Sequence, residues 1–337
     1  PLQRARLYRG WQKPAKFDRN LIVIGAGSGG LVSAYIATTV KASVTLIEKD
    51  RMGGDCLNTG CVPSKALIKS AKVASIARHS MDFGLKPLHP VADFAAVMDR
   101  VQSVIRTIEP HDSVERYSAL GVDCRQGTAR LVSPWEVEIS NEHGVKTLSA
   151  RNIIIASGAR PLVPPFPGLD KVDYLTTETL WKLHENPGRL LILGGGPIGC
   201  ELAQAFVRLG TRVTQVEMQP RILAREDEDA AELVANALRR DGVQLLLGHK
   251  AERFALENGE KVLYAKCGED TVRLAFDHVL IAIGRKPNTA GLGLEELGIE
   301  TKENGTLQLN EFLQTRFPNI YAVGDVAGPY QFTHTAA

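Results

Sequence analysis

The sequence predicts an α/β fold, because two apolar strand-like runs each end in a glycine-rich turn that opens a helical stretch. The first run, residues 21–24, leads into a G-x-G-x-x-G pattern at residues 25–30. The second run, residues 190–193, leads into the same pattern at residues 194–199, roughly 170 residues later. We therefore predict two Rossmann-like dinucleotide-binding domains, with the second inserted into the first.

Size and composition are compatible with such a fold. At 337 residues the chain is long enough for two or three domains, and its net charge of +2 with 23% charged residues does not suggest a nucleic-acid partner. Five cysteines in a chain of this length fit a reducing cytoplasm better than a secreted disulfide scaffold. No uncharged apolar run approaches the length of a membrane span.

The first βαβ unit has the features of a dinucleotide site. Gly25 makes the tight turn, Gly27 lets the backbone approach a pyrophosphate, and Gly30 lets the helix pack on the strand. The N-terminus of the helix favours the negative charge of the phosphates. Residues 43–47 form the second strand, and Glu48 at its end is placed to accept from ribose hydroxyls.

The second βαβ unit repeats this pattern, with a helix to Leu209 and a strand at 212–217. Glu217 ends that strand, where a carboxylate accepts from a free 2′-hydroxyl and repels a 2′-phosphate, so NAD(H) is expected in preference to NADP(H). Arg221 and Arg225 lie just downstream and keep NADP(H) as an alternative. Two such units in one chain suggest that one bound nucleotide passes electrons to the other.

A third motif lies at residues 53–65, Gly-Gly-Asp-Cys-Leu-Asn-Thr-Gly-Cys-Val-Pro-Ser-Lys. On a regular helix, Cys56 and Cys61 would lie about 7.5 Å apart along the axis and on different faces, too far for a disulfide. Gly60 and Pro63 can supply a local distortion. A bridge here would close a tiny loop and add little stability, which suggests redox chemistry. From spacing alone, two unpaired small apolar side chains are the simpler interpretation.

The segment from Gly53 to Lys65 resembles the active-site signature of the flavin-dependent pyridine nucleotide-disulfide oxidoreductases, which include dihydrolipoamide dehydrogenase, glutathione reductase and mercuric reductase. The resemblance extends over nearly the whole chain from about residue 21. It implies a redox-active Cys56–Cys61 disulfide, with Cys61 as the charge-transfer thiolate facing the flavin and Cys56 as the thiol that meets substrate. By the same resemblance Lys65 lies near flavin N5 and pairs with Glu201; without it, both would be surface charges.

The resemblance also assigns the cofactors, FAD to the first unit and NAD(P) to the second. Residues 127–129 resemble the segment whose backbone contacts adenine, and residues 152–161 resemble a second family motif, with serine in place of threonine. Residues 320–325 resemble the motif whose aspartate bonds the ribityl chain. The expected FAD set is Gly25, Gly27, Gly30, Glu48, Gly54, Ala129, Ser157, Gly158 and Asp325. The expected NAD(P) set is Gly194, Gly196, Gly199, Glu217 and Gly284, and no metal site is expected.

We expect the domains to follow these motifs along the chain. A basic linker would occupy residues 1–19, either as a solvated tail or as the connection to an N-terminal membrane domain at its cytoplasmic face. The FAD domain would occupy residues 20–160 and 287–337, and the NAD(P) domain residues 161–286.

The expected function is transfer of hydride from a nicotinamide through FAD to the cysteine pair, and onward to a small disulfide or a metal ion. Two alternatives stay open: a flavin reductase that acts on a quinone or metal without a disulfide, and a binding module without activity. In the family, the acid-base histidine lies in a C-terminal dimerisation domain. That domain is expected to be absent here, with homodimers expected only in its presence, and His334 is interpreted as structural.

Overall fold

The computed structural model describes residues 7–337, so the first six residues of the basic segment lie outside the described part. The chain forms two compact units. Unit 1 comprises Pro1–Cys61, Arg106–Arg160 and Lys286–Ala337, and unit 2 comprises Val62–Ile105 and Pro161–Arg285. The second unit is therefore inserted into the first in two pieces.

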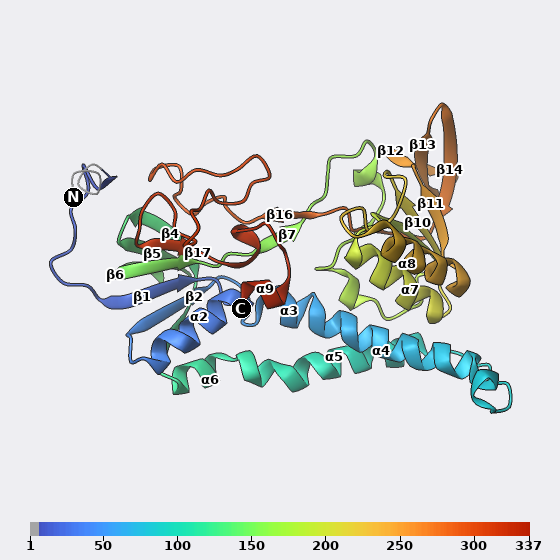
Figure 1. The fold of residues 1–337 in the computed structure, drawn as a ribbon, viewed down its shortest axis with the longest axis horizontal. Coiled ribbons are helices and arrows are strands. Elements are labelled where there is room, and N and C mark those ends of the chain that lie inside the picture. Colours follow the sequence, from blue (N-terminus) through green and yellow to red (C-terminus); the bar gives the residue numbers. More distant parts are fainter. Residues whose placement is uncertain (1–6) are drawn as a thin grey trace. The chain divides into compact units, whose positions relative to one another are not determined.

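Unit 1 is built around a seven-stranded sheet in the order β3-β2-β1-β6-β5-β4, with β17 paired to β6 (Figure 1). The strands from β3 to β6 and β17 pair in parallel, whereas β4, β5 and β6 form an antiparallel meander. The strands are β1 (Arg19–Ile24), β2 (Val44–Glu48), β3 (Val122–Gln126), β4 (Thr128–Ser133), β5 (Glu136–Asn141), β6 (Gly144–Ile155) and β17 (Ile320–Ala322). The helices are α2 (Ser28–Thr39), α3 (Gly54–Asn58), η2 (Glu109–Asp112), α6 (Val114–Ala119), η5 (Gly324–Val326) and α9 (Thr333–Ala336).

Strand β1 explains why the first apolar run is continuous. Its side chains alternate between two faces, with Ile22 and Ile24 in one buried cluster and Leu21 and Val23 in another. A parallel strand covered on both faces needs apolar residues at every position, which is the pattern of residues 21–24.

Unit 2 contains a five-stranded parallel sheet in the order β11-β10-β9-β15-β8 and a three-stranded antiparallel sheet β12-β13-β14. Its strands are β8 (Tyr174–Leu175), β9 (Arg189–Leu193), β10 (Arg212–Glu217), β11 (Gln244–Leu247), β12 (Lys250–Glu257), β13 (Glu260–Cys267), β14 (Asp270–Phe276) and β15 (His278–Ile281). Its helices are α4 (Cys61–Arg78), η1 (Ser80–Phe83), α5 (Phe94–Ile108), η3 (Leu169–Lys171), η4 (Leu180–Lys182), α7 (Pro197–Arg208) and α8 (Glu228–Asp241). The short strands β7 (Ala159–Pro161) and β16 (Arg285–Pro287) form a further two-stranded sheet where the chain passes between units.

The helical pair α4–α5 departs from the predicted boundaries. The sequence analysis assigned residues 62–105 to the first domain, but their contacts group them with unit 2. The rings of Phe94 and Phe206 lie 5.9 Å apart, and Gln102 Nε2 donates to Trp181 O at 2.9 Å. Burial of the apolar face of α5 against α7 accounts for the difference, which the sequence periodicity alone could not reveal.

The N-terminal segment is also less solvated than a free tail would be. The Tyr8 ring stacks on Trp135 with a centroid distance of 4.7 Å, and its hydroxyl donates to Asn319 Oδ1 at 2.6 Å. Asp18 accepts from the backbone N–H and hydroxyl of Ser149, which hold the pKa of Asp18 below its ordinary value. Tyr8 and Asp18 therefore tie the segment to unit 1, whereas the basic side chains Arg9, Lys13 and Lys16 between them are exposed.

Most other predicted elements agree with the structure in kind. The helical segment that begins at Phe94 is interrupted at residues 109–113, around Pro110, and β4–β6 form an antiparallel meander. No helix within residues 7–337 has the length and apolar character of a membrane span.

Candidate active site

The first glycine-rich turn has the geometry of a phosphate cradle. Gly25 has φ +103°, and a Cβ there would collide with the carbonyl oxygen of Ala156. A Cβ on Gly30 would collide with Gly25 O, so this position keeps α2 close to β1. At Gly27 the nearest atom to such a Cβ is Gly54 Cα, 4.0 Å away. The N-terminus of α2 is thus open to a ligand at Gly27, as a bound pyrophosphate requires.

Glu48 is fixed beside this turn by two backbone donors. Its Oε2 accepts from Ala26 N at 2.7 Å, and its Oε1 accepts from Asp50 N at 2.9 Å. Each carboxylate oxygen has a further lone pair, so the group can still accept from the hydroxyls of a ribose. The end of β2 and the glycine-rich turn therefore lie side by side, with the Glu48 carboxylate next to the N-terminus of α2.

The second turn repeats this arrangement in unit 2. Gly194 has φ +112° and its Cβ would collide with Ala282 O, while a Cβ on Gly199 would collide with Gly194 O. Gly196 has no atom within 4 Å of its Cβ position and corresponds to the open Gly27. Glu217 accepts from Gly195 N at 2.6 Å and from Gln219 N at 2.7 Å. The two turns therefore share the same backbone geometry and the same strand-end carboxylate.

The remaining predicted FAD residues lie in unit 1, several of them in contact with one another. Gly54 approaches Gly27 so closely that a Cβ on Gly54 would stand 2.6 Å from Gly27 Cα. Ser157 Oγ donates to Asn288 O at 2.7 Å, and Asn288 N donates to the carbonyl of Gly158 at 2.9 Å. Asp325 lies in η5, which is separated from the end of β17 by one residue.

Two predicted binding positions have a clear structural role of their own. Ala129 is 5% exposed and packs in the core beneath β4, so its side chain does not face a ligand. The predicted adenine contact there would use the backbone and stays a prediction. Gly284 O accepts from Leu162 N at 3.0 Å, which joins the strand end after β15 to the segment that precedes β8.

The cysteine loop has the distortion that the spacing requires. Cys56 lies in α3, the helix ends at Asn58, and α4 begins at Cys61. Gly60 occupies the break, where a Cβ would stand 2.9 Å from Asp55 O. Pro63 lies in the first turn of α4, where proline is tolerated, so the distortion comes from the helix break and not from Pro63. The side chains of Cys56 and Cys61 lie within hydrogen-bond distance of each other.

The surroundings of the two thiols differ. Cys61 begins the 18-residue helix α4, whose N-terminus stabilises negative charge on its sulfur. The hydrogen bond with Cys61 raises the pKa of Cys56 well above its ordinary value, and burial and the charges of Cys61 and Asp112 add to the rise. The Thr333 hydroxyl opposes this shift. The arrangement therefore disfavours a negative charge on Cys56.

Thr333 is a contact that the sequence analysis did not identify. Its Oγ1 lies 3.2 Å from Cys61 Sγ, within hydrogen-bond distance of the thiol. The residue begins α9, and the neighbouring His334 is exposed. Nothing in local sequence pairs a threonine with a cysteine 272 positions away, so only the tertiary fold could show this contact.

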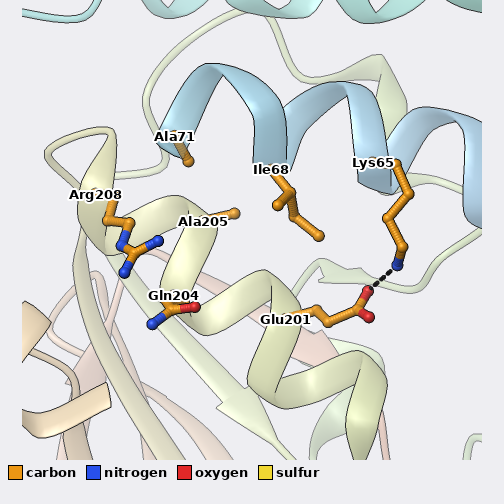
Figure 2. A pocket seen from close by; sticks show the side chains of 7 residues that line it. All are labelled: Lys65, Ile68, Ala71, Glu201, Gln204, Ala205 and Arg208. Carbon is orange, nitrogen blue, oxygen red and sulfur yellow. Dashed lines mark hydrogen bonds and ion pairs between the residues drawn. The ribbon is translucent and has the colours of Figure 1, made fainter. Parts of the chain in front are cut away.

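In unit 2, Lys65 and Glu201 form the predicted pair. Lys65 Nζ donates to Glu201 Oε2 at 2.6 Å across the space between α4 and α7 (Figure 2). The side chains are 58% and 42% exposed, so solvent screens the pair and it adds little stability. They line one end of a hollow of about 270 Å³. At its other end Arg208 donates to Asp241 Oδ2 at 3.0 Å.

The residues present fit the two dinucleotides that the fold implies: each unit has an open helix N-terminus with a strand-end carboxylate beside it, and unit 1 adds a dithiol. Within residues 7–337 no group of three or more His, Cys, Asp or Glu side chains could hold a metal ion. Together the fold and these sites are typical of oxidoreductases that use two nucleotides.

Comparison with known proteins identifies the family. Residues 19–337 match the pyridine nucleotide-disulphide oxidoreductase family, and the chain belongs to it. Members of this family bind FAD and NAD(P)H. The predicted family, the α/β fold with two Rossmann-like domains and the flavoprotein character are thus confirmed.

The relatives include enzymes with different substrates. The chain is 36% identical to mercuric reductase of Lysinibacillus sphaericus over 94% of its own length and 58% of that protein. It is 36% identical to dihydrolipoyl dehydrogenase of Acholeplasma laidlawii, with 95% and 93% covered. Among solved structures, a Cu(II) complex of the HOCl-induced flavoprotein disulfide reductase RclA from Escherichia coli superposes with a TM-score of 0.83 at 30% identity, over 96% of this chain and 69% of that one. The chain thus spans less than two thirds of the mercuric reductase.

Proposed function

We propose that this protein is a flavoprotein disulfide oxidoreductase that takes hydride from NADH and passes two electrons through FAD to the Cys56–Cys61 pair. The observation that carries the proposal is the cysteine loop, in which a helix break brings the two thiols together and places Cys61 at the N-terminus of α4. FAD supplies the step from hydride chemistry to thiol chemistry when it is bound.

The roles of the two cysteines follow from their surroundings. Cys61 is proposed as the thiolate, because the helix N-terminus and the Thr333 hydroxyl would both stabilise a negative charge on its sulfur. Cys56 retains its proton because Cys61 and Asp112 disfavour a second negative charge. Cys56 is therefore the thiol that is deprotonated only on reaction with substrate, and it attacks a disulfide or binds a metal ion.

Lys65 and Glu201 are proposed to serve the reductive half of the cycle. The ion pair holds the ammonium of Lys65 at a fixed place one helical turn after Cys61 on α4. A fixed positive charge there would stabilise the negative charge that develops on the flavin as it is reduced. Glu201 on α7 keeps the ammonium in place.

NADH is proposed as the donor because of Glu217 and Arg221. Glu217 is held by two backbone donors at the ribose position of the second turn. The Arg221 guanidinium donates to the carbonyls of Ala224 and Glu226 at 3.0 and 2.8 Å, so it is engaged within its own loop. Arg225 is exposed and is the residue on which NADPH binding would depend.

The substrate is a small disulfide or a metal ion, and the relatives define the compounds to test. One experiment uses the FAD-loaded chain with NADH and compares lipoamide, oxidised glutathione, Hg(II) and Cu(II), with Cys56→Ser as the matched control. We expect reduction of at least one compound that depends on Cys56. Equal turnover by wild type and Cys56→Ser would favour a flavin reductase that does not use the pair. Failure to bind FAD, or to accept hydride from NADH, would contradict the whole proposal.

A further inference from the structure

The second glycine-rich turn rests on a buried glutamine, whereas the first rests on a leucine. Gln215 lies on β10, two residues before Glu217, so the two side chains point to the same face of the strand. It is 0% exposed, and its Nε2 donates to Gly194 O at 2.9 Å. The corresponding residue of β2, two positions before Glu48, is Leu46. The second turn therefore has a side-chain donor that an apolar residue cannot supply to the first.

Gln215 and Glu217 hold the two ends of one peptide group. The carbonyl of the Gly194–Gly195 peptide accepts from Gln215, and its N–H donates to Glu217 Oε2 at 2.6 Å. The orientation of this peptide therefore determines where the Glu217 carboxylate lies. A peptide between two glycines turns over easily, because neither residue has a Cβ to restrict its dihedral angles. Without Gln215, the N–H could turn away from Glu217 and release the carboxylate.

The first turn restrains its peptide in a different way, which the second turn cannot use. That peptide runs from Gly25 to Ala26, and Ala26 N donates to Glu48 Oε2 at 2.7 Å. Turning it over would move φ of Ala26 toward the positive region, which a residue with a Cβ disfavours. In the second turn, a Cβ on Gly195 would stand 2.9 Å from Glu217 Cγ and displace that side chain. Glycine is therefore required at position 195, and the restraint has to come from another residue.

Packing alone does not explain a glutamine at this position. Within residues 7–337, Gln215 Oε1 is a buried side-chain oxygen without a hydrogen-bond partner. A buried acceptor of this kind costs stability, so burial by itself would favour leucine, as in the first turn. Nε2 also lies 3.6 Å from Cys200 Sγ, and that thiol donates to Gly195 O at 3.4 Å. Burial raises the pKa of the Cys200 thiol to about 11, so the thiol keeps its proton and remains a donor.

We propose that Gln215 is a positioning residue for the nicotinamide nucleotide: it fixes the Gly194–Gly195 peptide and, through it, the Glu217 carboxylate at the ribose position. The inference rests on the proposed function in one respect, namely that the second turn holds NADH. It implies that Gln215 acts only through Glu217, whereas a residue that merely supported the fold would affect binding whether or not Glu217 is present.

The test is a double-mutant cycle on the binding of ADP-ribose, which carries the pyrophosphate and the adenine ribose but cannot donate hydride. Affinity is measured by isothermal titration calorimetry on the FAD-loaded chain, in which the first turn is occupied. The variants are Gln215→Leu, which copies the first turn, Glu217→Ala and the double variant. Gln215→Met, nearer to glutamine in length, takes the place of Gln215→Leu if that variant does not fold. Thr214→Val is the control, because it removes a side-chain hydrogen bond from the opposite face of the same strand.

We expect Gln215→Leu to bind ADP-ribose about fivefold more weakly than wild type, which is the effect of one neutral hydrogen bond. In the Glu217→Ala background the same substitution should change the affinity by less than about twofold. At saturating NADH the rate of flavin reduction by Gln215→Leu should match wild type, and Thr214→Val should bind ADP-ribose as wild type does.

The outcomes separate this inference from the proposed function. Unchanged affinity in both Gln215→Leu and Gln215→Met, or an equal loss with and without Glu217, would overturn the inference and leave the proposed function standing. A wild type that does not bind ADP-ribose would contradict the assignment of NADH to the second turn, and the inference with it.

Discussion

Removal of the Glu217 carboxylate should abolish the discrimination between NADH and NADPH. In the structure this side chain already accepts from the backbone N–H groups of Gly195 and Gln219, at 2.6 and 2.7 Å. Those bonds hold both oxygens at the strand end, where each has a lone pair left for a ribose hydroxyl. The same fixed negative charge repels a 2′-phosphate, so one group both favours NADH and disfavours NADPH.

The size of the effect follows from the chemistry of that bond. A hydrogen bond to a charged group contributes about 1.5–3 kcal/mol, which corresponds to roughly a tenfold to hundredfold change in kcat/KM. Glu217→Ala should therefore lower kcat/KM for NADH by that factor, and should leave the value for NADPH unchanged or raised. The assay is steady-state or stopped-flow reduction of bound FAD over a range of each nucleotide.

Glu48→Ala is the matched control, because Glu48 makes the same two backbone contacts in the first turn, at 2.7 and 2.9 Å. It should weaken retention of FAD and leave the ratio of NADH to NADPH unchanged in molecules that keep the flavin. A wild-type preference for NADPH, or a Glu217→Ala variant with an unaltered ratio, would refute the reasoning and direct attention to Arg225.

Two further predictions concern the thiols. Asp112→Asn removes a negative charge that raises the pKa of Cys56. Alkylation of Cys56 by iodoacetamide becomes faster as the pH rises through that pKa, so in the variant this increase should occur at lower pH than in wild type. An unshifted pH profile of Cys56 alkylation, measured by peptide mass spectrometry, would contradict the prediction. Thr333→Val removes a hydroxyl that lies 3.2 Å from Cys61 Sγ and lowers the pKa of Cys56. The reduced pair should therefore ionise at higher pH than in wild type, as followed by ultraviolet thiolate absorbance of the NADH-reduced protein. Thr335→Val, whose hydroxyl donates to Phe332 O, should behave as wild type, and equal shifts in both variants would mean that α9 acts only through its fold.

The sequence predicted the nucleotide turns well because their constraints are local. Positive φ at Gly25 and Gly194, and the collision that a Cβ at Gly30 or Gly199 would cause, involve residues close in the chain or at the end of the next parallel strand. Residue type at these positions is therefore nearly dictated by the backbone. The break between α3 and α4 was also accessible, because two cysteines five positions apart cannot meet on a regular helix.

Features set by distant contacts were not accessible in the same way. Thr333 reaches Cys61 only after the last segment of the chain returns to unit 1. The assignment of residues 62–105 to unit 2 depends on Phe94 meeting Phe206, and the packing of Tyr8 depends on Trp135. Each of these contacts joins apolar surfaces that are far apart in the sequence. Periodicity shows which face of a helix or strand is apolar, but it does not show which other surface that face packs against.

The most direct test of the proposed electron path is an anaerobic titration of the FAD-loaded chain with NADH, followed by absorbance. Our account predicts that about one equivalent of NADH produces a long-wavelength charge-transfer band, because Cys61 carries the thiolate beside the flavin while Cys56 keeps its proton. Cys61→Ser should lack the band, and Cys56→Ser should show it, even before NADH is added. A band that persists in Cys61→Ser and disappears in Cys56→Ser would show that the two roles are reversed, and a wild type that forms no band would contradict transfer through the pair.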